Sequence, residues 1–169
     1  MAKEIVSDDI LQKVEFDSEA IANVVEDITS HYSADLDEYV AFIKGILQDD
    51  EKPPTDTELN DFALNLSTLI YYTSVGCEQL GIRDDIARST YKEAYNIARD
   101  GITTGTVADK NTQAELQAVQ ERIVSIVYEK AYKILKAKTE SASELLSVVK
   151  KCITKRISDN ELTKAQVYN

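Results

Sequence analysis

The chain has 169 residues, of which 43% are hydrophobic and 29% are charged, and its formal net charge at pH 7 is −11. Only five glycines and two prolines occur, which argues against strand-rich folds, since these need a turn every ~8–12 residues. The composition therefore predicts an all-α protein with one core of ordinary size.

Charge is distributed unevenly along the chain. Residues 1–62 carry 17 acidic and 4 basic side chains, whereas residues 122–156 carry 3 acidic and 9 basic ones. Such an asymmetry can indicate a polyanion-binding end with an acidic arm. It can equally indicate that acidic N-terminal helices pack against a basic C-terminal helix.

The first part of the chain shows apolar residues at helical spacing. They predict one or two short helices over 7–29, an interruption at His31–Ser33, and a further helix that ends near Leu47. Ser33 is a suitable N-cap for that further helix, because its hydroxyl can accept a hydrogen bond from a free backbone N–H.

A linker follows at Asp49–Pro54, where two prolines favour an extended backbone and three acidic residues favour solvent. It divides the chain into an acidic N-terminal helical arm over 1–52, a Pro-rich linker over 53–56 and a main helical body over 57–169.

Two helices of medium length are predicted next. Thr55 and Glu58 fit the capping-box pattern, and a helix follows over 57–80, with Gly81 placed to end it. A second helix is predicted over 84–99, with the acidic Asp84 and Asp85 at its N-terminus. The expected apolar faces contain Leu59, Phe62, Leu66, Leu69, Ile70 and Thr73 in the first helix, and Ile86, Tyr91, Ala94, Tyr95 and Ala98 in the second.

Residues 100–106 read as a loop, and after Val107 no glycine or proline occurs. This predicts one very long helix over 108–157, in which 139–143 is the weakest point. The expected architecture is thus an elongated helical hairpin or bundle with a smaller acidic N-terminal part. The apolar set of the long helix is Leu116, Val119, Ile123, Ile126, Val127, Ala131, Ile134, Leu145, Val148, Val149 and Cys152.

Patterns typical of enzymes are missing from the sequence. His31 is the one histidine, Cys77 and Cys152 lie 75 residues apart among apolar neighbours, and Gly101–Gly105 lacks the Lys-Ser/Thr ending of a phosphate-binding loop. We expect buried thiols, no metal, no cofactor, no small-molecule substrate and no catalytic residue. The N-terminus has no apolar leader and no run of ~18 apolar residues occurs, so a cytoplasmic protein without a membrane span is expected.

Residues 122–156 combine basic and tyrosine side chains on one predicted helix. Lysines at helical spacing can follow a phosphate backbone, and tyrosine rings can stack on unpaired bases. The candidate residues for binding single-stranded nucleic acid are Arg122, Tyr128, Lys130, Tyr132, Lys133, Lys136, Lys150, Lys151, Lys155 and Arg156. The alternative is a solvated face with ion pairs four residues apart, such as Glu129 with Lys133 and Lys136 with Glu140.

A family resemblance exists in the same region. Tyr128–Lys133, Glu144–Lys151 and Arg156 resemble the helical C-terminal half of small phage proteins of the UvsY-like recombination-mediator type, over about residues 107–157. The resemblance implies a phage protein that forms a ring, binds single-stranded DNA and helps to load a recombinase. The acidic residues 1–62 depart from that pattern.

Three functions remain open at this stage. The first is a non-enzymatic accessory protein that binds single-stranded DNA, protein partners or both, and acts in the cytoplasm of a host cell if a phage encodes it. The second is a structural or assembly protein, such as a virion component or helical adaptor, whose long helix forms homo-oligomers. The third is an inhibitor whose acidic residues 1–62 mimic nucleic acid.

Overall fold

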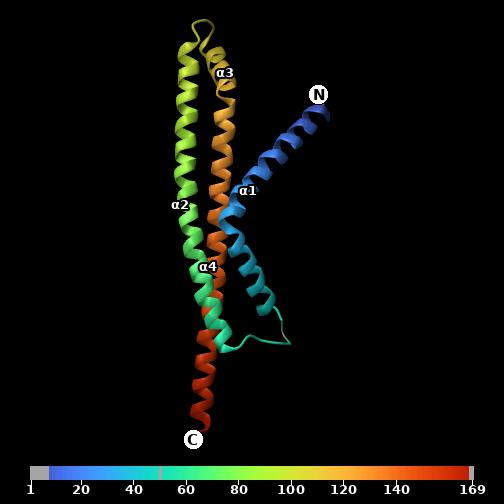
Figure 1. Ribbon diagram of the computed structural model, residues 1–169, viewed down its shortest axis with the longest axis vertical. Coiled ribbons are helices and arrows are strands. Elements are labelled where there is room, and N and C mark those ends of the chain that lie inside the picture. The colour runs from blue at the N-terminus through green and yellow to red at the C-terminus, as the bar shows by residue number, and fades with distance from the viewer. Residues whose placement is uncertain (1–7, 50, 168–169) are drawn as a thin grey trace, which may run out of the picture. The chain divides into compact units, whose positions relative to one another are not determined.

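The computed structural model describes residues 8–49 and 51–167, and all four elements in it are helices (Figure 1). The predicted all-α class is therefore confirmed. The elements are α1 (Asp8–Leu47), α2 (Asp56–Gly101), α3 (Val107–Gln117) and α4 (Val119–Val167). No helix in this part of the chain combines the length and the apolar character that crossing a bilayer requires.

Helix α1 runs through the predicted interruption at His31–Ser33, so that prediction was wrong. Ser33 lies inside the helix, fully buried, and is not an N-cap. Its hydroxyl donates to Asp37 at 2.8 Å and accepts from Lys138 Nζ at 3.0 Å, while Lys138 also donates to Asp37 at 2.5 Å. A serine that would compete with a helix is tolerated here because its hydroxyl is satisfied by side chains.

Helix α2 is likewise continuous, and the predicted stop at Gly81 was wrong. Both of its inner glycines face aromatic rings. A Cβ built at Gly76 would lie 2.6 Å from Cδ1 of Tyr32, and one at Gly81 would lie 3.4 Å from Cε2 of Tyr132. Gly76 therefore allows α1 and α2 to approach closely, which explains a glycine in a helix interior despite its low helix propensity.

The capping box at the start of α2 is confirmed. The Thr55 N–H donates to Glu58 Oε2 at 2.6 Å, and the Glu58 N–H donates to Thr55 Oγ1 at 3.2 Å. Glu58 Oε2 accepts from the Thr55 N–H and also, at 2.8 Å, from the Thr55 hydroxyl. These two hydrogen bonds, with the charges of Lys52 and Arg156 as smaller causes, lower the pKa of Glu58 from its usual 4.5. A carboxylate is favoured at this position because it accepts from N–H groups at the positive end of the helix.

The lowered pKa of Glu58 predicts acid-dependent stability. A carboxyl group with a lower pKa in the folded state stabilises the protein above its unfolded pKa, and this contribution is lost as the pH falls through the folded pKa. We expect Glu58→Gln to lower the melting temperature at neutral pH. The difference from wild type should shrink as the pH falls below 4.5. Thermal melts of both chains at neutral pH and below pH 4.5 measure this. A difference in melting temperature that does not change with pH would contradict the prediction.

The predicted single helix over 108–157 is replaced by two helices. Thr106 caps α3 through a second capping box with Asp109, and Ala118 separates α3 from α4 with φ −96° and ψ 17°. The hydrogen-bond ladder continues across this point, since Ala118 N–H donates to Ala114 O at 3.0 Å and Arg122 N–H donates to Ala118 O at 3.1 Å. No break occurs at 139–143, where α4 is continuous and the hydroxyls of Thr139 and Ser143 donate to the carbonyls of Leu135 and Thr139.

The helices form two compact units, each made of segments far apart in sequence. Unit 1 contains Met1–His31 and Gln79–Lys133, and unit 2 contains Tyr32–Glu78 and Ile134–Asn169. The predicted boundary at residues 53–56 stays a prediction. The core of unit 2 consists of Leu36, Ile43, Leu59, Phe62, Leu66, Ala142 and Val149.

Unit 1 has a core of smaller side chains. Its buried apolar residues are Val25, Leu80, Ala87, Ala114, Ala118, Val127 and Ala131. Buried polar groups accompany them, among them Asp84, which is paired through both carboxylate oxygens with Arg88 at 3.0 and 2.6 Å. Many small residues bring helix backbones close together but leave larger apolar side chains at the edges of the contact.

Candidate protein-binding surface

Large apolar side chains are exposed on unit 1, including several that the sequence placed in the core. Ile86, Leu116 and Ile123 were expected to face inward, but each is exposed in the structure. The exposed large apolar residues of this unit include Val14, Phe16, Val24, Ile82, Ile86, Ile97, Val107, Leu116, Val119, Ile123 and Val124. Four of them, Val24, Ile86, Ile123 and Val124, line the two grooves described below. Contiguous apolar surface marks interaction sites more often than single scattered residues do.

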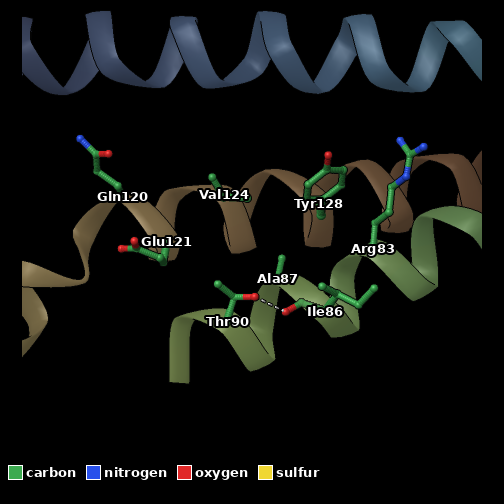
Figure 2. Close-up of a pocket in the computed structure, with 8 residues that line it drawn as sticks. All are labelled: Arg83, Ile86, Ala87, Thr90, Gln120, Glu121, Val124 and Tyr128. Carbon is green, nitrogen blue, oxygen red and sulfur yellow. Dashed lines mark hydrogen bonds between the residues drawn. The ribbon is translucent and has the colours of Figure 1, made fainter. Parts of the chain in front are cut away.

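One groove lies between α2 and α4. It has a volume of about 430 Å³ and is lined by Arg83, Ile86, Ala87 and Thr90 from α2 and by Gln120, Glu121, Val124 and Tyr128 from α4. Figure 2 shows Gln120 and Glu121 at one end of this groove and Arg83 at the other. The Thr90 hydroxyl donates to the Ile86 carbonyl at 3.0 Å. The middle of the groove is therefore apolar, and its ends carry opposite charges.

A second groove lies between α1 and α4 and has a volume of about 380 Å³. Its lining is apolar apart from the hydroxyl of Tyr128, and consists of Ala20, Ile21, Val24, Ile28, Ile123, Val124, Val127 and Tyr128. Val124 and Tyr128 line both grooves. The two grooves thus form one surface, which we call the trough, with α4 as its floor and α1 and α2 as its walls.

The walls of the trough differ in charge. The α1 segment 12–31 carries five acidic side chains and one basic side chain. The segments 79–92 of α2 and 119–133 of α4 together carry six basic and four acidic ones. The hydrogen bond and charge of Lys133, then the charges of Arg88 and Lys130, lower the pKa of Glu129. The trough therefore has an acidic α1 wall, while its α2 wall and its α4 floor each carry three basic and two acidic side chains.

The predicted nucleic-acid-binding residues all lie on α4 and are divided between the two units. Five of them belong to each unit, namely Arg122, Tyr128, Lys130, Tyr132 and Lys133 to unit 1, and Lys136, Lys150, Lys151, Lys155 and Arg156 to unit 2. Both tyrosines and Arg156 are half-buried, and the other seven residues are exposed.

Several of these residues have partners within the fold. Tyr128 lines the trough, and the ring of Tyr132 lies against Gly81. Lys133 pairs with Glu129, as the alternative interpretation predicted, and Arg156 pairs with Asp56 at 2.9 Å. Exposed Glu140 and Glu144 lie among the lysines of the same helix. The exposed face of α4 is thus a mixture of both charges.

The thiols of Cys77 and Cys152 are free and half-buried, whereas the sequence predicted buried thiols. Burial, followed by the charge of Glu78, raises the pKa of Cys77, which keeps this thiol protonated at neutral pH. In residues 8–49 and 51–167 no group of three or more His, Cys, Asp or Glu side chains is arranged to hold a metal ion.

Sequence reasoning missed the trough because it counted every apolar residue at helical spacing as core. A usable signal was present in 116–127. The apolar residues there form a face wider than one helix contact can cover, and they are Leu116, Val119, Ile123, Val124 and Val127.

In comparisons with known proteins, the chain matches no protein family, no curated protein and no solved structure.

Proposed function

We propose that the protein is a non-enzymatic structural or assembly protein that associates with copies of itself through exposed apolar helix faces. The apolar side chains exposed at the two grooves of unit 1 support this proposal most directly, because contact with another chain would remove their apolar surface from water. Ile86 is 60% exposed and Val124 is 48% exposed, although both lie at grooves between packed helices.

Solvent-exposed segments near the ends of α1 and α4 support the same proposal. Residues 12–20 of α1 are exposed at every position, and Phe16 is 73% exposed. Residues 157–162 of α4 are also exposed at every position, including Ile157 and Leu162. Single helices of this length are marginal in water, so contacts with another chain would stabilise them.

Light scattering coupled to size-exclusion chromatography tests the proposed function. We expect the molar mass of the full chain to rise with protein concentration to a defined multiple of 18.9 kDa. A monomer at every concentration would end the proposal. The far-ultraviolet circular dichroism of the same samples controls for unfolding.

Binding of single-stranded nucleic acid is a second candidate, supported by the exposed bases Lys136, Lys150, Lys151 and Lys155 of α4. If they contact phosphates, replacing Lys150, Lys151 and Lys155 with glutamine should weaken binding of a single-stranded oligonucleotide. It should also reduce the salt dependence by roughly 0.7 in log–log slope per lost contact.

The matched control replaces three exposed lysines outside α4, namely Lys13, Lys52 and Lys92, with glutamine. The control should retain the affinity and the salt dependence of the wild type. Fluorescence anisotropy at low and high salt measures both variants, and an absence of binding even at low salt would reject the candidate.

A further inference from the structure

We infer that one exposed face of α2 pairs with the same face of a second copy, as a two-stranded antiparallel coiled coil. The inference rests on the proposed function and adds to it the contact surface, the number of copies and the direction of the helices. The face lies wholly within unit 2 and consists of Leu64, Thr68, Tyr71 and Val75, which we call the seam. All four side chains are exposed, and the exposed fraction of Leu64 and of Tyr71 is 66%.

The spacing of the seam is that of a coiled coil. Its residues follow one another at intervals of four, three and four, which places them on one side of the helix at alternating a and d positions of a heptad. These intervals read the same in both directions along the chain. In an antiparallel pair centred between Thr68 and Tyr71, the two seams therefore lie at matching levels. Leu64 of each copy is beside Val75 of the other, and Thr68 is beside Tyr71.

The sizes of the side chains complement one another in this arrangement. The bulky ring of Tyr71 lies beside the small Thr68 at both central levels, so the levels are filled evenly. A parallel pair would place Tyr71 beside Tyr71 and Thr68 beside Thr68, which crowds one level and leaves space at another. The Thr68 hydroxyl already donates to the Leu64 carbonyl at 3.0 Å, so a second copy can cover it without leaving the donor unsatisfied.

The charges along α2 favour a second copy as the occupant. From Phe62 to Cys77 no residue is charged, although the net charge of the whole chain is −11. A charged partner gains nothing from this neutral face, whereas two equally acidic copies can meet on it without like charges in contact.

The acidic residues on either side of the neutral stretch favour the antiparallel direction. Asp56, Glu58 and Asp61 of the two copies are held apart in an antiparallel pair, whereas a parallel pair would place them at the same level. Asp61 reaches the level of Glu78 of the other copy, but at ~100° per residue these two carboxylates lie on opposite edges of the seam. Antiparallel helices also place their macrodipoles in opposite directions.

The apolar area of this face is that of a reversible dimer. Tyr72 is 67% exposed beside the seam, and its ring is in edge contact with that of Tyr71, with 5.5 Å between the ring centroids. A fully covered tyrosine buries about 150–250 Å², so the two rings offer roughly 200–300 Å² per copy. Leu64 and Val75 add to this area, but the total stays below the ~800 Å² per partner of a standard interface. We therefore expect a dimer that dissociates on dilution, and unfolding measurements on dilute samples report the monomer.

Two glutamate substitutions locate the contact. Tyr71→Glu places carboxylates at the two central levels, and Leu64→Glu places one at each end of the seam. We expect each variant to weaken the dimer about tenfold or more, because each covers a charge that has no partner.

Val148→Glu is the matched control, because it adds the same charge at a residue that is 47% exposed on α4 of the same unit and lies outside the seam. This control should dimerise as the wild type does. Sedimentation equilibrium of the full chains measures the dissociation constant, and circular dichroism verifies the helix content.

Disulfide crosslinking tests the direction of the helices. Leu64→Cys and Val75→Cys are made separately in chains whose native Cys77 and Cys152 are replaced with alanine. The antiparallel pair brings positions 64 and 75 together, so a mixture of the two variants should form linked dimers under mild oxidation. Each variant alone should not, because identical positions are then 11 residues apart along the axis, about 16 Å, and a disulfide joins Cα atoms within ~7 Å. Linked dimers of each variant alone, with no link between positions 64 and 75 in the mixture, would overturn the antiparallel pair.

The outcomes separate this inference from the proposed function. Self-association that Tyr71→Glu and Leu64→Glu leave unchanged, or an assembly of three or more copies, would overturn the seam dimer and leave the proposed function standing. A wild-type chain that is monomeric at all concentrations would overturn both.

Discussion

Leu66→Ala is expected to lower the free energy of unfolding by about 2–5 kcal/mol, because it removes most of a fully buried side chain and leaves a cavity. Leu66 has 0% exposure in the core of unit 2. That core draws side chains from three helices, among them Ile43 from α1, Phe62 from α2 and Val149 from α4. These helices cannot collapse around the cavity without moving one another, so the loss should lie in the upper part of that range.

Leu64→Ala is the matched control for this prediction. Leu64 is two residues away on α2 and 66% exposed, so its truncation should change stability by no more than about 0.5 kcal/mol. Urea unfolding followed by circular dichroism measures both variants. Hydrogen exchange should show faster exchange in residues 56–78 of α2 for Leu66→Ala only. Equal effects of the two substitutions would mean that this face of α2 is not the buried one.

Local signals were the part of the fold that the sequence could predict. The capping box of Thr55 and Glu58 spans three residues, and its hydrogen bonds form within one turn whatever the rest of the chain does. The buried positions Leu59, Phe62 and Leu66 were also predicted, since their spacing of three and four residues places them on one face.

Signals that depend on distant contacts were misinterpreted. Ser33 has the chemistry of an N-cap, but Lys138, 105 positions later, satisfies its hydroxyl inside α1. Gly81 has the chemistry of a helix stop, but it lies against the ring of Tyr132 inside α2. Neither partner can be identified from the residues beside these positions, so local propensity predicted a break where tertiary packing maintains the helix.

The candidate surface could not be predicted for a related reason. Spacing shows that Ile86 and Ile123 lie on an apolar side of their helices, but it does not show how many neighbouring helices will cover that side. In unit 1 the inner contact is made by small residues such as Ala87 and Ala131, and the larger side chains are left at its edge. The difference between predicted and observed burial is thus itself the strongest pointer to an interaction surface.

Gly76→Ala is expected to destabilise the protein by about 1–2 kcal/mol, although alanine is the better helix former by about 1 kcal/mol. The added Cβ would lie 2.6 Å from Cδ1, 3.0 Å from Cγ and 3.2 Å from Cβ of Tyr32. These atoms are at the base of the side chain, so a rotation of the ring cannot relieve all three contacts. The backbones of α1 and α2 would have to move apart.

Gly81→Ala is the control, because its Cβ would meet the Tyr132 ring at an ordinary contact distance of 3.4 Å. It should stabilise α2 by about 0.5–1 kcal/mol through helix propensity alone. A double-mutant cycle then isolates the cause. In a Tyr32→Ala background Cδ1 and Cγ are absent and only the 3.2 Å contact with Cβ remains, so the destabilisation by Gly76→Ala should shrink strongly. Urea unfolding of the four chains of the cycle measures the coupling, and an undiminished destabilisation by Gly76→Ala in the Tyr32→Ala background would show that the Tyr32 ring is not its origin.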